Sequence, residues 1–417
     1  MRNRPPRPAL ATLCFLMLGL VLAPAIALPQ ERDNTVQGAL ERYLVSTARH
    51  GSTRDAQGVW MQSAESVLLH HRGAVPLTAA SLTKVATTLA ALYTWGPSHR
   101  FPTVVGIAGA VRGGVLQGDL VVRGGSDPFF VWEDAIILGN TLERAGIRRV
   151  DGRLLIVGAF YMNFVLDPAG AGGLLRQALS AAAWPSEAMT QYHTLPRYTA
   201  KPEIDISGPV QVVQALPQGY VPIVRHDSLP LFDILKRMNV YSNNAMAEML
   251  TIAMGGSDRM RQTAGKAAGV DPKELRLNNG SGLGQTNRIS PRAVCALFIA
   301  THQFLQLDSL GVSDVFPVAG RDSGTVEGRD LPALAAVKTG TLDNVSTLGG
   351  VIFTREHGPV WFALLNRGTN RSALRAQQDT LLQHVTRSWG GMEDVPSAFR
   401  PLDLEMEFVR DTILSRP

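Results

Sequence analysis

The chain of 417 residues is long enough for two or three compact domains. Hydrophobic residues make up 45% of it and charged residues 18%, a composition that supports a buried core and excludes a disordered chain or a coiled coil. The formal charge is +5, and loss of three arginines near the N-terminus would leave about +2 (5 − 3). The charge therefore does not indicate binding to nucleic acid, and we expect no nucleic-acid partner.

The first residues have the pattern of a secretory signal peptide, residues 1–27. Three arginines precede an apolar run, Ala9–Leu22, which is too short to span a bilayer, and Ala25-Ile26-Ala27 resembles a cleavage site. An uncleaved membrane anchor is the alternative. Cleavage after Ala27 would leave Cys295 as the only cysteine, so no disulfide could form within the mature chain. We expect an exported protein of the periplasm or cell envelope, with no stable membrane span in its mature form.

The next segments show two different patterns of secondary structure. Val59–Leu69 is predicted to form a hairpin, and a helix is predicted from Ala80 to Leu92, before the stop signal Gly96-Pro97. From Phe101 to about Arg225, short strand-like runs alternate with Gly and Pro turns, and one helix is predicted at Val131–Ala145. This change predicts a β-rich unit, residues 99–225, inserted into the first domain.

Helices are predicted again from Ser228, which is expected to cap the first of them, and over Asn244–Met254. Three adjacent strands and an amphipathic helix follow: Val337–Gly340, Gly349–Phe353, Val360–Leu365 and Ser372–Trp389. We therefore predict an α+β fold in which helices flank an antiparallel sheet. Residues 28–98 and 226–392 would form this discontinuous domain, and residues 393–417 a C-terminal tail.

Two of the six lysines occur in unusual settings, whereas the chain has 34 arginines (40 − 6). Lys84 follows Ser81 by three residues at a helix start, so its amine can reach the serine hydroxyl on the same helix face. A buried lysine can lose its proton and activate a serine as a nucleophile. The alternative is a helix-capping serine followed by a surface lysine.

A second group, Ser242-Asn243-Asn244, lies between two predicted helices. Ser242 could pass a proton between a base and a leaving group, while Asn244 could hydrogen-bond a substrate amide. Asn243 or Asn244 acting only as a helix cap is the alternative.

The third group is Lys338-Thr339-Gly340-Thr341 on a predicted strand. Lys338 and Thr339 would suit a carboxylate, and Gly340 would let a ligand approach the backbone. The Thr341 N–H could form half of an oxyanion hole. By itself this tetrapeptide is equally typical of a turn.

Taken together and in this order, the three groups resemble the motifs of penicillin-binding proteins and β-lactamases. Two longer stretches, Leu77–Lys84 and Arg237–Ala245, resemble D-alanyl-D-alanine carboxypeptidases/endopeptidases, the class C low-molecular-weight penicillin-binding proteins. Asn279–Leu283 and Lys338–Leu342 share this resemblance, as do Asn287–Pro291, Gly118–Leu120 and Gly124–Pro128. It implies a β-lactamase/transpeptidase-like domain with an inserted domain between the first and second motifs.

The resemblance also implies the chemistry. Ser81 would form an acyl-enzyme with D-Ala-D-Ala peptides of peptidoglycan, with Lys84 as base and Ser242 as proton carrier. Asn244, Lys338, Thr339, Gly340 and Thr341 would bind substrate, and β-lactam antibiotics would acylate Ser81. No cofactor and no metal are implied. The sequence departs from the family where Asn279 replaces the usual Asp and Gly284 a common Ser, and its insert is shorter.

Two alternatives remain open on the sequence. A β-lactamase would need a second base, for which Glu274 has a suitable position between the second and third motifs. A non-catalytic cell-wall-binding protein could keep the same fold. The nine histidines show no metal-ligand spacing, which argues against a metalloenzyme.

Overall fold

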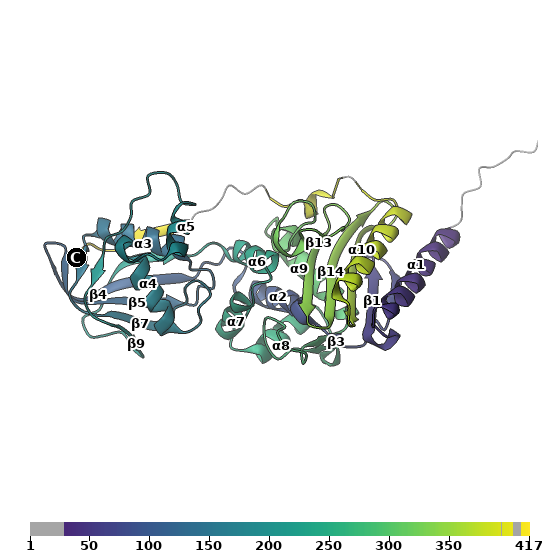
Figure 1. The fold of residues 1–417 in the computed structure, drawn as a ribbon, viewed down its shortest axis with the longest axis horizontal. Coiled ribbons are helices and arrows are strands. Elements are labelled where there is room, and N and C mark those ends of the chain that lie inside the picture. Colours follow the sequence, from purple (N-terminus) through teal and green to yellow (C-terminus); the bar gives the residue numbers. More distant parts are fainter. Residues whose placement is uncertain (1–28, 393, 403–409) are drawn as a thin grey trace, which may run out of the picture.

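The computed structural model describes residues 29–392, 394–402 and 410–417, so the predicted signal peptide lies outside the described residues. The chain forms two lobes that are connected through a narrow region (Figure 1). We call residues 29–100 and 228–402 the main lobe, and residues 101–227 with 410–417 the inserted lobe. Each lobe has its own cluster of buried apolar side chains.

The main lobe is built on a sheet of five described strands in the order β13-β14-β15-β1-β2. The predicted strands near the C-terminus are confirmed, and they pair antiparallel with one another and with the N-terminal hairpin. Their bounds are β1 (Gln57–Gln62), β2 (Val67–His71), β13 (Ala336–Leu342), β14 (Val345–Thr354) and β15 (Gly358–Arg367). A small second sheet contains β3 (Leu77–Thr78), β11 (Leu275–Arg276) and β12 (Arg288–Ile289).

Helices cover both faces of the five-stranded sheet, which explains why β14 and β15 are buried along most of their length. In β15, Val360, Phe362 and Leu364 pack toward one face, whereas Trp361, Ala363 and Leu365 pack toward the other. The first face is covered by α1 (Pro29–Arg49) and α10 (Arg371–Ser388). The other carries α2 (Thr83–Trp95), α6 (Leu231–Val240), α7 (Asn244–Ala253), α8 (Ser257–Ala267) and α9 (Pro291–Gln306).

The connection between the lobes corrects one prediction. Ser228 does not cap α6, which begins at Leu231 after Pro230. Its hydroxyl instead accepts a hydrogen bond from the Phe101 N–H at 2.9 Å and donates to the Leu229 carbonyl. Ser228 therefore ties together the two chain segments that pass between the lobes.

The inserted lobe contains a larger sheet, whose described strands follow the order β16-β10-β4-β5-β6-β8, with β7 and β9 branching from β5. Its strands are β4 (Pro102–Arg112), β5 (Val115–Gly125), β6 (Arg149–Val150), β7 (Leu154–Ala159), β8 (Asp205–Ile206), β9 (Val210–Val213), β10 (Val221–Asp227) and β16 (Arg410–Ile413). The predicted helix is present as α3 (Trp132–Ala145), but α4 (Pro168–Ala178) and α5 (Ser186–Tyr192) were not predicted. Glycines at positions 170, 172 and 173 give α4 a weak helical signal.

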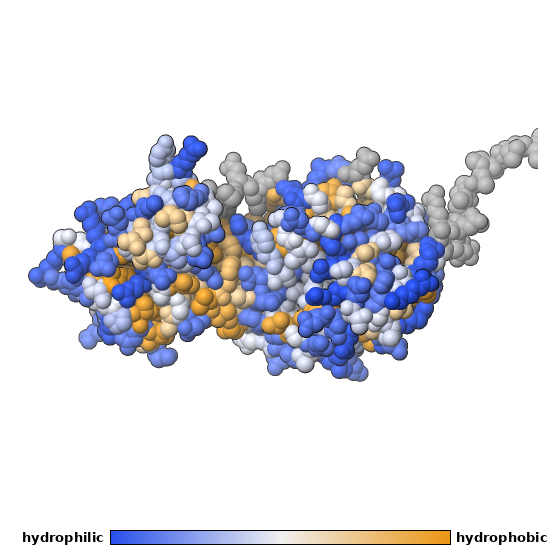
Figure 2. Space-filling model, in the orientation of Figure 1, coloured by the Kyte–Doolittle hydropathy of each residue, from blue (hydrophilic) through white to orange (hydrophobic). Residues whose placement is uncertain are grey.

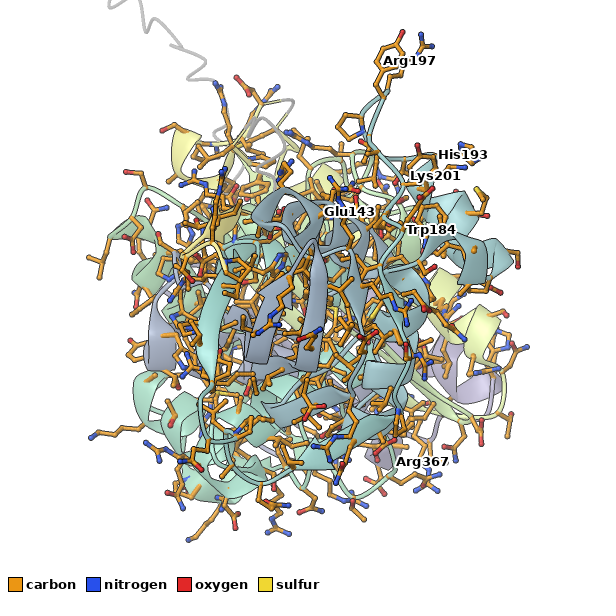
Figure 3. All side chains as sticks on the ribbon, turned by 90° about the vertical axis from the view of Figure 1, so that its left-hand side faces the viewer. Glu143, Trp184, His193, Arg197, Lys201 and Arg367 are labelled. Atoms are coloured by element: carbon orange, nitrogen blue, oxygen red, sulfur yellow. The ribbon has the colours of Figure 1, made fainter. Side chains whose placement is uncertain are left out.

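On the surface of this lobe, Lys201 lies above two aromatic rings, 5.0 Å from the centroid of Tyr192 and 5.9 Å from that of Trp184 (Figure 3).

In the face shown in Figure 2, hydrophobic residues gather on the lower side of the inserted lobe and near its junction with the main lobe. No helix in the described ranges combines the length and hydropathy that a bilayer span requires.

Candidate active site

Ser81 lies in a short 3-10 turn, Ala80–Leu82, that leads into α2. Lys84 is in the first turn of α2 and is fully buried. Its Nζ donates to Ser81 Oγ at 3.0 Å, to Asn244 Oδ1 at 2.8 Å and to the Ser281 carbonyl at 2.8 Å. The structure therefore rules out a surface position for this lysine.

The second motif reaches the same place from the loop between α6 and α7. Ser242 has a positive φ of 53°, and its Oγ accepts a hydrogen bond from Lys338 Nζ at 2.9 Å. Asn243 caps α7 by accepting from the Met246 N–H, which leaves Asn244 to contact Lys84. The two asparagines thus have separate tasks, one structural and one within the site.

The third motif lies on β13, an edge strand of the five-stranded sheet. A Cβ atom added to Gly340 would lie 2.2 Å from Thr347 Oγ1 and 2.9 Å from the Ser81 nitrogen. A side chain at this position would push β13 away from the turn that carries Ser81. Thr347 also donates to the Ala79 carbonyl at 3.1 Å, which fixes β14 against the same turn.

The three motifs are thus assembled around two buried lysines. Burial lowers the pKa of Lys84 to about 7, although the negative charge of Glu248 opposes this effect. Burial also lowers the pKa of Lys338 well below its ordinary value, and repulsion from Lys84 lowers it further. Among the described residues, neither ammonium group has a carboxylate hydrogen-bond partner. A neutral Lys84 amine is therefore available near pH 7.

Sequence reasoning missed the residues that hold the Ser281 carbonyl on Lys84. The Glu248 carboxylate accepts from the backbone N–H groups of Gly280 and Ser281, and Thr87 Oγ1 donates to the Gly280 carbonyl at 2.7 Å. Glu248 lies one helical turn after Asn244, so their spacing already places both on one face of α7. That spacing was the available signal.

Asn279, the departure from the usual acidic residue, shapes this loop. Its Oδ1 accepts from the Gly282 N–H at 2.8 Å and from Asn287 Nδ2 at 3.1 Å, while its Nδ2 donates to the Leu283 carbonyl. A carboxylate could accept the first two bonds but could not donate the third. The amide therefore suits the loop without adding a charge.

Glu274, the candidate second base of a β-lactamase, is engaged by neighbouring side chains. Its carboxylate accepts hydrogen bonds from the Ser290 hydroxyl and from the Arg292 guanidinium, and its side chain is buried. These contacts hold β11, β12 and the start of α9 together.

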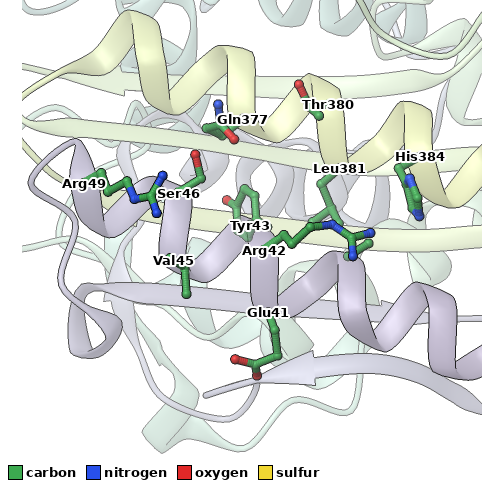
Figure 4. A pocket seen from close by; sticks show the side chains of 11 residues that line it. Glu41, Arg42, Tyr43, Val45, Ser46, Arg49, Gln377, Thr380, Leu381 and His384 are labelled. Atoms are coloured by element: carbon green, nitrogen blue, oxygen red, sulfur yellow. The ribbon is translucent and has the colours of Figure 1, made fainter.

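Two further observations concern metal sites and pockets elsewhere in the protein. The described residues contain no group of three or more His, Cys, Asp and Glu side chains that could hold a metal ion. A groove of about 550 Å³ between α1 and α10 (Figure 4) is lined by side chains of those two helices, such as Arg42, Arg49 and His384. No residue of the three motifs lines this groove.

Comparison with known families decides the class of this arrangement. The profile of the D-Ala-D-Ala carboxypeptidase 3 (S13) family matches residues 40–163 and 177–388. The chain belongs to this family. Membership confirms the predicted resemblance and the predicted enzyme class, a serine-type D-Ala-D-Ala carboxypeptidase that acts on peptidoglycan peptides.

Curated relatives agree with this assignment. A D-alanyl-D-alanine carboxypeptidase of Actinomadura sp. (strain R39) is 31% identical over 178 residues, which cover 37% of this chain and only 32% of that protein. D-alanyl-D-alanine carboxypeptidase DacB of Haemophilus influenzae is 22% identical over 411 residues. The alignment covers 75% of this S13 chain and 85% of the Haemophilus protein.

Solved structures confirm the predicted fold class. The penicillin G-acylated Bd3459 endopeptidase of Bdellovibrio bacteriovorus, in complex with immunity protein Bd3460, has a TM-score of 0.72 at 22% identity and covers 85% of this chain and 99% of its own. Penicillin-binding protein 4 of Haemophilus influenzae, complexed with a β-lactam, has a TM-score of 0.64 at 19% identity, covering 84% and 99%.

Proposed function

We propose that this family member hydrolyses the D-Ala-D-Ala end of peptidoglycan stem peptides, or their cross-links, through an acyl-enzyme on Ser81. Two lysine contacts carry the proposal. Lys84 hydrogen-bonds both Ser81 and Asn244, and Lys338 of the third motif hydrogen-bonds Ser242 of the second. Each motif thus contacts another that lies far away in the sequence.

In the first step, the neutral Lys84 amine takes the proton of Ser81 Oγ, which attacks the carbonyl carbon of the penultimate D-alanine. The negative charge on the carbonyl oxygen would be stabilised by the N–H groups of Ser81 and Thr341. The C–N bond then breaks, and Ser242 helps to deliver a proton to the departing amine. Lys338 and Thr339 bind the carboxylate of the leaving D-alanine, and Asn244 orients the acyl donor.

In the second step, water attacks the ester on Ser81, and the hydroxyl recovers its proton. A β-lactam would acylate Ser81 in the same way, because its strained amide resembles the peptide bond. The ester that remains would be hydrolysed slowly.

We also propose that the enzyme is exported to the periplasm or cell envelope after removal of residues 1–27. The substrate supports this location, since peptidoglycan lies outside the cytoplasmic membrane. For the domains, we propose residues 28–98 and 226–392 as the catalytic unit and residues 99–225 as the accessory unit. The separate apolar cores of the two lobes support this division.

A labelled penicillin tests the site. Incubation of the mature protein should give one adduct, and peptide mapping should locate it on Ser81. Ser81→Ala should abolish labelling while the free energy of unfolding changes by less than about 0.5 kcal/mol, because a partly exposed hydroxyl contributes little stability.

Other results have clear meanings. A label on another residue would overturn the site assignment, no label at all would favour a non-catalytic wall-binding protein, and rapid turnover of the penicillin would favour a β-lactamase. Product analysis on purified stem peptides and cross-linked dimers would then separate trimming of terminal D-alanine from cross-link cleavage.

A further inference from the structure

Arg375, on the first turns of α10, reaches the end of the third motif from outside the three motifs. Its Nη2 donates to Thr341 Oγ1 at 2.7 Å. Thr341 follows Thr339 by two residues on β13, and alternate residues of a strand point to the same side of a sheet. The guanidinium is therefore bound to the neighbour of the threonine that, with Lys338, is proposed to hold the substrate carboxylate.

Arg375 forms no direct ion pair within the part of the chain that the structure describes. Among the described residues, no carboxylate forms an ion pair with it, and Thr341 is its hydrogen-bond partner. Asp379, the nearby acidic group, is held by Arg329 through both carboxylate oxygens. Partial burial lowers the pKa of Arg375, the positive charges of Arg329 and Arg371 lower it further, and the negative charge of Asp379 opposes this effect. An arginine nevertheless stays protonated in proteins, so a positive charge without a direct ion pair among the described residues lies beside β13.

The direction of the hydrogen bond gives Thr341 a defined role. A threonine hydroxyl has one proton to donate and two positions that accept. Because Arg375 donates to Thr341 Oγ1, one accepting position is filled, and the hydroxyl proton remains available for another acceptor. A carboxylate beside Lys338 and Thr339 would be such an acceptor, and it would also be attracted by the positive charge of Arg375.

We propose that Arg375 is a positioning residue that makes this site selective for substrates with a carboxylate on the carbon next to the scissile nitrogen. The inference rests on the proposed function and adds a residue outside the three motifs. Arg375 orients the Thr341 hydroxyl as a donor and contributes positive charge, so acids bind and react better than their neutral derivatives. A purely structural arginine, which only ties α10 to β13, would slow acids and neutral derivatives alike.

The test compares benzylpenicillin with its methyl ester, which has the same β-lactam ring but no charge on the carboxyl group. The second-order rate of Ser81 acylation is measured for both compounds by intact-protein mass spectrometry. For Arg375→Gln, we expect the rate with the acid to fall about 10- to 100-fold, as for loss of a hydrogen bond to a charged group. The rate with the ester should change less than about threefold. Arg375→Lys, which keeps the charge, should recover part of the preference.

Arg371→Gln is the matched control, since Arg371 is one turn earlier on α10 and its guanidinium donates to the Leu342 carbonyl at 3.5 Å rather than to Thr341. It should leave both rates unchanged. Equal slowing of acid and ester by Arg375→Gln, or an unchanged preference, would overturn the inference while leaving Ser81 acylation intact. If the wild-type protein reacts with neither compound, the proposed function itself fails. Should Arg375→Gln unfold below the assay temperature, Thr341→Val gives the same comparison and should lower the preference for the acid.

Discussion

At the residue scale, the chemistry depends on the protonation of Lys84. The chain retains lysine at this position although arginine outnumbers lysine overall. The amine is fully buried and makes three hydrogen bonds, and its burial brings its pKa to about 7. An arginine could make similar contacts but could not give up its proton.

The rate of Ser81 acylation should therefore rise with pH and level off above about 7. Lys84 must be neutral to accept the serine proton, and its lowered pKa means that the neutral form predominates above that value. Stopped-flow acylation by a chromogenic β-lactam between pH 5 and 9 measures this profile. A rate independent of pH across this range would show that Lys84 is not the base.

Substitution of the same residue gives a second measurement. Lys84→Arg should reduce the acylation rate by about 10²- to 10⁴-fold, the usual contribution of a general base. The acylation rate of this variant should also no longer rise with pH near 7. Lys266→Arg is a suitable control because Lys266 lies on α8 outside the three motifs.

At the element scale, the close packing of β13 against the Ser81 turn is the critical contact. Gly340→Ala would place a methyl group 2.9 Å from the Ser81 nitrogen, so the strand must shift. We expect the acylation rate to fall on the order of 100-fold, because removal of one oxyanion donor costs about this much. Benzylpenicillin kinetics, with thermal unfolding to verify the fold, would measure it.

Gly173→Ala is the matched control for that change. Gly173 lies in α4 of the inserted lobe, and an added Cβ meets no atom within 4 Å. Alanine should stabilise this helix by about 0.5–1 kcal/mol and leave acylation unchanged. An unchanged acylation rate in Gly340→Ala would mean that β13 does not form part of the oxyanion site.

Elements of this protein were predictable where burial leaves a periodic pattern. β13, β14 and β15 are largely buried because helices cover both faces of their sheet, and all three were predicted. Helix α1 was missed, although Val36, Leu40 and Leu44 form a buried stripe at helical spacing. Helix α4 gave no usable signal, since its glycines weaken the helical pattern. A Cβ atom at Gly172 would lie 2.7 Å from Val210 Cγ1, a close approach to a distant residue that local spacing does not reveal.

At the scale of the whole molecule, the C-terminal tail links the two lobes. Ala398 and Phe399 pack on the main lobe, whereas β16 pairs with β10 of the inserted lobe. Asp411 of β16 lies 2.7 Å from His226 Nδ1, and both side chains are buried, with 3% and 0% of their surfaces exposed. Thr141 also donates to Asp411, so this short strand closes one side of the inserted sheet.

Asp411→Ala should therefore destabilise the inserted lobe by about 3–5 kcal/mol, because it leaves a buried partner without its counterpart. Calorimetry should show an earlier unfolding transition, while penicillin acylation at lower temperature persists. Arg410→Ala, at an exposed neighbouring position, should change neither measurement. A single unshifted transition in Asp411→Ala would contradict a stabilising role for β16.

The sequence by itself determined the order of the three motifs and the residues in each, and it predicted an inserted unit between the first two. These depend on local spacing and on the apolar periodicity that each segment carries. Only the tertiary structure decided that Lys84 is buried near pKa 7, that Glu248 and Asn279 shape the loop above it, and that Arg375 reaches Thr341. The reason is physical: burial and charge depend on neighbours from distant parts of the chain, and local spacing does not specify which segments will meet.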